Sequence, residues 1–284
     1  MDTASTDIFP QIVISLAIAL AIFFIYMVFE QLYKAYITYG SARIPVYPMT
    51  GSSSKVIKQD PTNSNSKTLV LSENQLTGIE FSYSTFLYIS EDTDDDTEGW
   101  KTVFYKGYES GPFPLCGPGV FVSSKSDVNG GPTLRVVMNT YDTWYNTIDV
   151  KQIPFNKWFH LALVLRNNAM EIYVNGNLAT KKVFNGTLPY QNYQPLNLFP
   201  SVTTLAGAFT SNAQVQTKGI PVGDNFIIRG KMSGYISNLY YYSYALSYSE
   251  IQSALNIGPS SQFDQGSMDK PPYLIDSWWT QRRG

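Results

Sequence analysis

The chain has 284 residues, of which 44% are hydrophobic and 15% aromatic, and its formal net charge is −2. This apolar content excludes a disordered chain. The near-neutral charge excludes nucleic acid as an expected partner, because phosphate binding needs a clustered excess of Lys and Arg.

An uncharged apolar run opens the chain. Residues 8–29 contain no charged side chain, and residues 12–29 are almost continuously apolar. As a helix, the inner run would reach roughly 27 Å, close to the hydrocarbon thickness of a bilayer. We therefore predict an N-terminal segment over residues 1–10 and a single transmembrane helix over residues 11–30. The residues expected to lie in the lipid are Ile12, Leu16, Leu20, Phe24 and Val28.

A cleaved signal peptide is the alternative interpretation of this run. The preceding residues include Asp2 and Asp7 but no basic residue, and no small-residue cleavage site follows closely. The apolar core is also longer than that of a usual signal peptide. These features favour a retained anchor with the lipid bilayer as its partner.

The residues that flank the apolar run predict the orientation. Lys34 and Arg43 follow it, so the positive-inside rule places the C-terminal part in the cytosol. The single cysteine, Cys116, agrees, because exported domains of this size often carry paired cysteines. The sequon Asn185-Gly186-Thr187 indicates the opposite side, since glycosylation occurs only in a lumen.

Residues 31–67 are predicted to form a juxtamembrane segment and tether. They contain Pro45, Pro48 and Pro61, together with a stretch rich in Ser, Asn and Thr. From residue 68 the pattern changes to short apolar or alternating runs separated by turn residues. These runs cover residues 69–71, 80–89, 102–105, 120–123, 134–139, 158–165, 171–174, 226–228 and 235–242.

Many short strands with little helical periodicity predict an all-β fold, an antiparallel sandwich over residues 68–258. Asn175-Gly176 predicts a tight hairpin turn within it, because both residues tolerate positive φ angles. One helix is expected after Ser247, which has the capping-box spacing to Glu250, and Gly258-Pro259 should end it.

Residues 259–284 form a separate tail rich in Pro, Trp and Arg. A short tail cannot bury two adjacent Trp side chains on itself, so either a partner surface or a groove on the domain should receive them. The residues predicted to make this contact are Tyr273, Trp278, Trp279, Arg282 and Arg283.

Three motifs follow one another within this domain. Trp158, His160 and Ala162 form a W-x-H-x-A strand, and residues 170–178 contain a Y-V-N-G hairpin. Residues 234–251 contain a closing strand followed by the helix start A-L-S-x-x-E-I. In order and spacing, these motifs resemble the laminin-G-like form of the concanavalin A-like jelly roll. The resemblance implies an antiparallel jelly-roll sandwich, a fold that hosts lectins, glycosidases and adhesion modules alike.

The order of anchor, tether, domain and tail also resembles membrane-associated minor capsid proteins of large DNA viruses. This resemblance implies a virion component that links an internal membrane to the capsid shell. The partners would then be capsid or other structural proteins, and the domain would lie on the cytosolic side during assembly.

An acid-rich stretch over residues 91–98 offers a candidate metal site. Asp92, Asp94 and Asp96 would supply the oxygen ligands that calcium prefers, although such a run is also typical of a solvated hairpin loop. No other cofactor is expected.

The sequence predicts that the protein is not an enzyme. A retaining glycosidase needs two carboxylates about 5 to 5.5 Å apart on one strand face, whereas the acids here are contiguous. His160 is the only histidine and lies in an apolar strand, so we expect it to be buried and hydrogen-bonded. Cys116 has no nucleophile signature around it.

Tyrosine is unusually frequent, with 21 residues. On a strand, Tyr240 and Tyr242 face one side and Tyr241 the other. Such rings suit sugar stacking, protein interfaces or a tyrosine-rich core. The alternative function is therefore a carbohydrate-binding adhesion protein on a cell or virion surface, with glycans as partners.

Overall fold

The computed structural model describes residues 8–63, 66–72, 79–108, 116–127, 130–143, 145–184, 188–201, 203–204 and 226–264. At residues 8, 9, 34–41, 203 and 204 it describes the backbone alone. The chain divides into two compact units, Met1–Arg43 and Ile44–Gly284.

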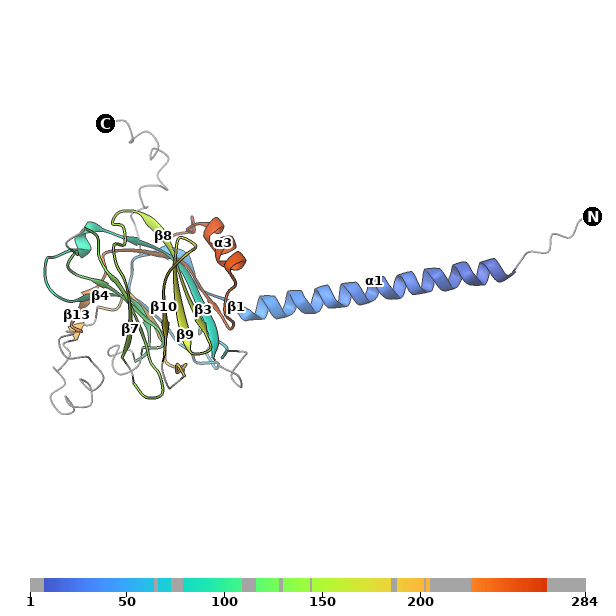
Figure 1. The fold of residues 1–284 in the computed structure, drawn as a ribbon, viewed down its shortest axis with the longest axis horizontal. Coiled ribbons are helices and arrows are strands. Elements are labelled where there is room, and N and C mark those ends of the chain that lie inside the picture. Colours follow the sequence, from blue (N-terminus) through green and yellow to red (C-terminus); the bar gives the residue numbers. More distant parts are fainter. Residues whose placement is uncertain are drawn as a thin grey trace, which may run out of the picture. The chain divides into compact units, whose positions relative to one another are not determined.

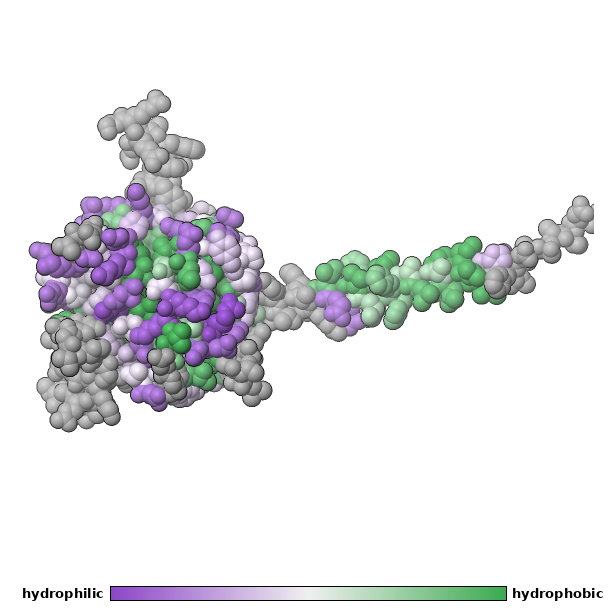
Figure 2. Space-filling view, in the orientation of Figure 1, coloured by the Kyte–Doolittle hydropathy of each residue, from purple (hydrophilic) through white to green (hydrophobic). Residues whose placement is uncertain are grey.

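The first unit contains the helix α1, Ile8–Ala42. Its segment Pro10–Tyr33 has a mean hydropathy of 2.9 and is long and apolar enough to cross a membrane. Figure 2 shows apolar residues covering this helix along most of its length. All five residues predicted to lie in lipid are exposed, between 42% at Val28 and 70% at Phe24. The predicted apolar helix is confirmed, and it continues as helix beyond the predicted end at residue 30.

The second unit is a sandwich of two sheets (Figure 1). The six-stranded sheet has the order β1(Arg43–Gly51), β14(Gly234–Tyr242), β3(Glu80–Ile89), β8(Trp158–Arg166), β9(Ala169–Val174) and β10(Asn177–Val183). The second sheet has the order β12(Thr203–Thr204), β13(Ile228–Lys231), β4(Trp100–Lys106), β5(Gly119–Ser123), β6(Leu134–Met138) and β7(Asn146–Val150). Two further strands, β11(Leu196–Leu198) and β2(Lys55–Ile57), extend it beside β4. The predicted antiparallel jelly-roll sandwich is confirmed, and β13 pairs with β4 in the parallel direction.

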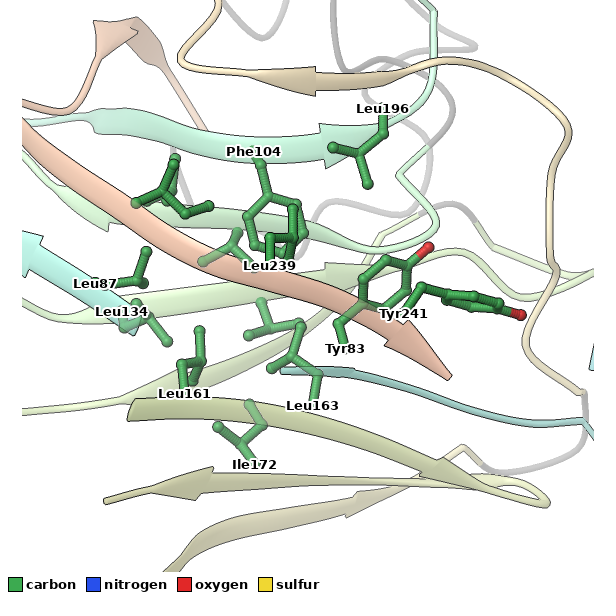
Figure 3. Close-up of a cluster of buried hydrophobic side chains, with 14 of the residues drawn as sticks. Tyr83, Leu87, Phe104, Leu134, Leu161, Leu163, Ile172, Leu196, Leu239 and Tyr241 are labelled. Carbon is green, nitrogen blue, oxygen red and sulfur yellow. The ribbon is translucent and has the colours of Figure 1, made fainter. Parts of the chain in front are cut away.

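The main core lies between the two sheets. Alternate residues of β3 point into it, among them Tyr83 and Leu87, and the ring of Tyr83 packs near that of Phe104 of β4. Figure 3 shows these side chains packed with the inward-facing residues of the other strands, namely Leu134, Leu161, Leu163, Ile172, Leu196, Leu239 and Tyr241. The intervening residues of β3 therefore face away from the core.

The local predictions for the hairpin and the helix are confirmed. Asn175 and Gly176 have φ angles of 50° and 76° between β9 and β10. The helix α3(Tyr248–Ile257) begins with a complete capping box between Ser247 and Glu250. A second apolar cluster contains Ile251 of α3 and outward-facing residues of the six-stranded sheet, including Tyr242. The alternation of the Tyr-rich strand is as predicted, since Tyr241 lies in the main core.

The predicted tether is wrong for part of residues 31–67. Arg43–Gly51 forms β1, at one edge of the six-stranded sheet, and Lys55–Ile57 forms β2. Val46 and Tyr47 are buried in the core. The prolines of β1 indicated a tether, but an edge strand tolerates them because its outer N–H groups need no partner. Residues 69–71, predicted as a strand, are not one.

Candidate functional site

Three aromatic side chains lie next to each other at one end of the six-stranded sheet. Tyr88 of β3 pairs with Tyr235 of β14 on one side and with Trp158 of β8 on the other. The ring centroids are 6.0 Å apart for Tyr88 and Tyr235, and 5.7 Å apart for Tyr88 and Trp158. All three are half-buried, and their strand neighbours Leu87 and Ile89 point into the core. We call this row of three rings the aromatic row.

An open cleft of about 460 Å³ adjoins the aromatic row. Two of its rings, Tyr88 and Tyr235, form part of the wall. The remaining lining residues are mostly polar: Ser52, Ser90, Asp92, Lys231, Met232, Ser233 and Gly234. The cleft therefore combines aromatic faces with a carboxylate, an amine and hydroxyl groups.

The close approach of β3 and β14 shapes the cleft. The N–H of Ser90 donates to the carbonyl of Ser233 at 2.9 Å, and the Thr93 hydroxyl donates to the same carbonyl at 2.9 Å. Gly234 has a φ of 147°, and a Cβ there would lie 1.9 Å from the carbonyl oxygen of Tyr88. Only glycine fits at this position without displacing one strand.

The carboxylate of Asp92 is held by a single turn of 3₁₀ helix, Glu91–Thr93. Ser90 caps this turn, and its hydroxyl lies 3.2 Å from Oδ2 of Asp92. On the other side of the cleft, Nζ of Lys231 donates to the carbonyl of Ser52 at 3.4 Å. Both charged side chains belong to residues that are exposed to solvent.

The phenol of Tyr88 stays protonated near neutral pH. Burial raises its pKa, and the negative charge of Glu91 raises it further. Its hydroxyl is therefore available as a hydrogen-bond donor as well as an acceptor.

This combination is suited to binding a polyhydroxylated ring. Aromatic faces stack on apolar C–H groups, while Asp92, Ser90 and Lys231 supply hydrogen-bond acceptors and donors for hydroxyl groups. Among the residues that line the cleft, Asp92 is the one carboxylate, whereas retaining hydrolysis uses two.

The family model for the concanavalin A-like lectin/glucanases superfamily matches residues 63–252. The chain belongs to this superfamily. The description covers both lectins and glucanases. Membership in the concanavalin A-like superfamily therefore establishes a binding-type fold, and any activity has to be argued from the residues of the site.

Solved structures with a similar fold include toxin domains and a sialidase. The receptor-binding domain of botulinum neurotoxin D is 12% identical, with a TM-score of 0.44, over 75% of this chain and 43% of that one. The Trypanosoma rangeli sialidase in complex with the inhibitor DANA is 15% identical, with a TM-score of 0.37, over 62% of this chain and 22% of that one. The chain thus spans less than half of either protein. No curated protein matches it.

The structure separates the three carboxylates predicted to bind calcium. Asp92 lines the cleft, Asp94 accepts a hydrogen bond from the Ser126 hydroxyl, and Asp96 forms an ion pair with Lys125 at 3.4 Å. Across the described part of the chain, no three His, Cys, Asp or Glu side chains gather where they would hold a metal ion. The geometry therefore offers no support for the predicted calcium site.

The neighbouring Asp95 is occupied by protein partners. Burial raises its pKa, but hydrogen bonds from Lys101 and Thr97 outweigh this and lower the pKa to about 2. Its Oδ2 lies 2.6 Å from Nζ of Lys101. This acidic loop is thus partly neutralised by lysines that the protein itself provides.

Other predicted site residues have different outcomes. Tyr273, Trp278, Trp279, Arg282 and Arg283 lie outside the described residues, as does the sequon at residues 185–187. His160 is fully buried and lies 2.8 Å from the Ser84 hydroxyl, as predicted for a structural histidine. Cys116 is buried, and burial raises the pKa of its thiol, which makes it a poor nucleophile.

The aromatic row was not predicted as a site. Trp158 was noted as part of a family motif and Tyr235 as part of a Tyr-rich strand, but nothing in the sequence connected them with Tyr88. The cross-strand register would have revealed this site, because it brings together residues from three distant segments.

Proposed function

We propose that this chain is a membrane-anchored, non-catalytic glycan-binding protein that uses the cleft beside Tyr88 and Tyr235. The observation that supports this proposal is the pairing of two half-buried tyrosine rings with a polar, open cleft. A sugar would place its apolar ring face on the tyrosines and its hydroxyl groups against Asp92, Ser90 and Lys231.

A glycan array with the detergent-solubilised full chain tests this function. Tyr88→Ala and Tyr235→Ala should each weaken binding roughly tenfold, or about 1.4 kcal/mol, because each removes one stacking face. Tyr193→Ala is the matched control, since Tyr193 is 66% exposed and does not line the cleft. Absence of glycan binding, or equal loss in the control, would contradict the proposal.

The same array, repeated with and without calcium, tests the metal site predicted at Asp92, Asp94 and Asp96. If calcium supports binding, its removal should weaken the interaction, and Asp94→Asn and Asp96→Asn should reproduce the loss. If glycan binding does not depend on calcium, the predicted metal site has no part in it and the cleft is the proposed glycan site.

Retention of α1 as an anchor is also a proposal, because a signal sequence near the N-terminus can likewise form a long apolar helix. The intact mass of the mature protein distinguishes the two, since cleavage would remove most of residues 8–42. Protease protection in sealed membranes then tests whether the domain lies on the cytosolic side, as Lys34 and Arg43 predict.

A virion protein that links an internal membrane to a capsid shell is the second candidate function. It is favoured by an exposed apolar helix and a binding-type domain in one chain. Capsid contacts would then involve the tail residues Trp278, Trp279, Arg282 and Arg283. Cross-linking of intact particles should give links from the tail to capsid proteins, and a lack of such links would count against this function.

A further inference from the structure

β1 and β2 enclose a second, more apolar pocket of about 260 Å³, which we call the β1–β2 pocket. Its lining is mainly aliphatic and aromatic, with two lysines: Val46, Tyr47, Pro48, Met49, Lys55, Val56, Ile57 and Lys67. Val56 is 44% exposed although it is apolar. An open apolar pocket of this kind fits a short apolar segment.

The rim of the β1–β2 pocket is positively charged. Nζ of Lys67 donates to the carbonyl oxygens of Pro45 and Val46 at 2.8 and 3.2 Å, so these bonds leave its charge uncompensated. Burial lowers the pKa of Lys67, and the charge of Lys55 lowers it further. A ligand with one acidic group beside its apolar part would therefore match this pocket.

The last described residue, Asp264, sits at the rim of this pocket. Its Oδ2 accepts hydrogen bonds from the Tyr47 hydroxyl at 3.0 Å and from Nζ of Lys55 at 2.9 Å. The backbone before it is fixed to β1, because Thr50 N donates to Gln262 O at 2.7 Å and Asp264 N donates to Thr50 O at 2.9 Å. Residues 265–284 therefore begin beside the β1–β2 pocket.

The segment that follows has the matching chemistry. Tyr273-Leu274-Ile275-Asp276 is a run of three apolar residues ended by an acid. Tyr273 follows Asp264 by nine positions, which allows a reach of up to about 30 Å. Because both parts belong to one chain, the effective concentration is on the order of millimolar, and even weak contacts would be occupied.

We propose that residues 273–276 of this chain bind in the β1–β2 pocket. The apolar side chains lie against Val46, Met49 and Val56, and the carboxylate of Asp276 faces Lys67. The tail thereby folds back onto its own domain, and Trp278 and Trp279 follow close to β1.

Site-specific photo-cross-linking tests this proposal on the full chain in detergent micelles. A benzophenone amino acid in place of Tyr273 should link, within the same chain, to residues 46–49 or 55–57. Val56→Asp should lower the yield of this link roughly tenfold, since it places a charged carboxylate in the apolar part of the pocket and repels Asp276. Val70→Asp is the control, because Val70 is 48% exposed and does not line the pocket.

A charge exchange gives a second measurement that does not depend on Val56. Lys67→Glu should lower the cross-link several-fold, and adding Asp276→Lys to it should restore most of the yield. Links that join two chains in an isotope-mixed sample, links to detergent or to other surfaces of the domain, or a yield unaffected by both Val56→Asp and Lys67→Glu would each overturn the proposal.

Discussion

The hydroxyl of Ser84 on β3 lies 2.8 Å from Nε2 of His160 on β8, at a site where the histidine is fully buried. The ring of Phe86 covers the imidazole at a centroid distance of 4.9 Å. Nδ1 of His160 has no hydrogen-bond partner among the described residues. Protonation would therefore bury a charge together with an unpaired N–H donor, so the neutral ring is strongly favoured.

The first prediction concerns the pH dependence of stability. Burial lowers the pKa of His160 from 6.5 to about 4. Between these values the unfolded state binds a proton that the folded state does not, so stability falls as the pH decreases. From pH 7.5 to pH 5 this site should remove about 2 kcal/mol from the free energy of unfolding. Urea titrations of the detergent-solubilised chain at both pH values measure the loss.

His160→Gln provides the comparison for this measurement, because it keeps a polar group near Ser84 but does not titrate. The variant should lose much less stability over the same pH range, whatever its absolute stability. An equal loss in both proteins would assign the pH dependence to other groups.

The second prediction concerns Arg135, which is 8% exposed. Its Nε and Nη2 donate to the two carboxylate oxygens of Asp149 at 2.7 Å each, and Nη1 donates to the Tyr145 hydroxyl at 2.9 Å. Its guanidinium also stacks on Trp100 at 4.1 Å. Arg135→Lys keeps the charge but loses the paired bonds and the stacking, so we expect a cost of about 2 kcal/mol in urea unfolding.

The matched control for Arg135 is an exposed ion pair. Lys125 and Asp96 are 3.4 Å apart with side chains 54% and 88% exposed, so Lys125→Ala should cost less than about 0.5 kcal/mol. A comparable cost for the two substitutions would contradict a special role for the pair of Arg135 and Asp149.

The third prediction compares two glycines with positive φ. Gly234→Ala would place a Cβ 1.9 Å from the Tyr88 carbonyl oxygen, whereas at Gly130, with φ of 80°, nothing lies within 4 Å of the added Cβ. Gly130→Ala should cost about 1 kcal/mol from backbone strain alone. Gly234→Ala should lower the thermal midpoint clearly further and distort the cleft. Equal midpoints would show that β3 and β14 separate easily.

The fourth prediction tests the membrane segment. Leu20 lies near the middle of Pro10–Tyr33, where an arginine costs about 2.5 to 3.5 kcal/mol of insertion free energy. Leu20→Arg should therefore raise the fraction of protein released by alkaline carbonate. Tyr33→Arg should not, because an arginine at the end of the span extends to the headgroup layer. If alkaline carbonate released the unmodified chain as well as both variants, the result would contradict the role of α1 as a membrane anchor.

Local rules explain which parts of the fold could be predicted. The Asn175-Gly176 turn and the capping box at Ser247 depend on a few adjacent residues, and both occur where the sequence places them. β1 was missed because Pro45 and Pro48 are typical of a tether, and only its pairing with β14 at the sheet edge makes it a strand.

The sequence by itself determined an apolar N-terminal helix and a sandwich of alternating strands, because hydrophobic periodicity is set by near neighbours along the chain. Only the tertiary structure decided that Tyr235, Tyr88 and Trp158 form one row beside a polar cleft, and that Asp264 lies at the β1–β2 pocket. These contacts depend on strand order and register, which join residues far apart in the chain and are fixed by how the two sheets pack.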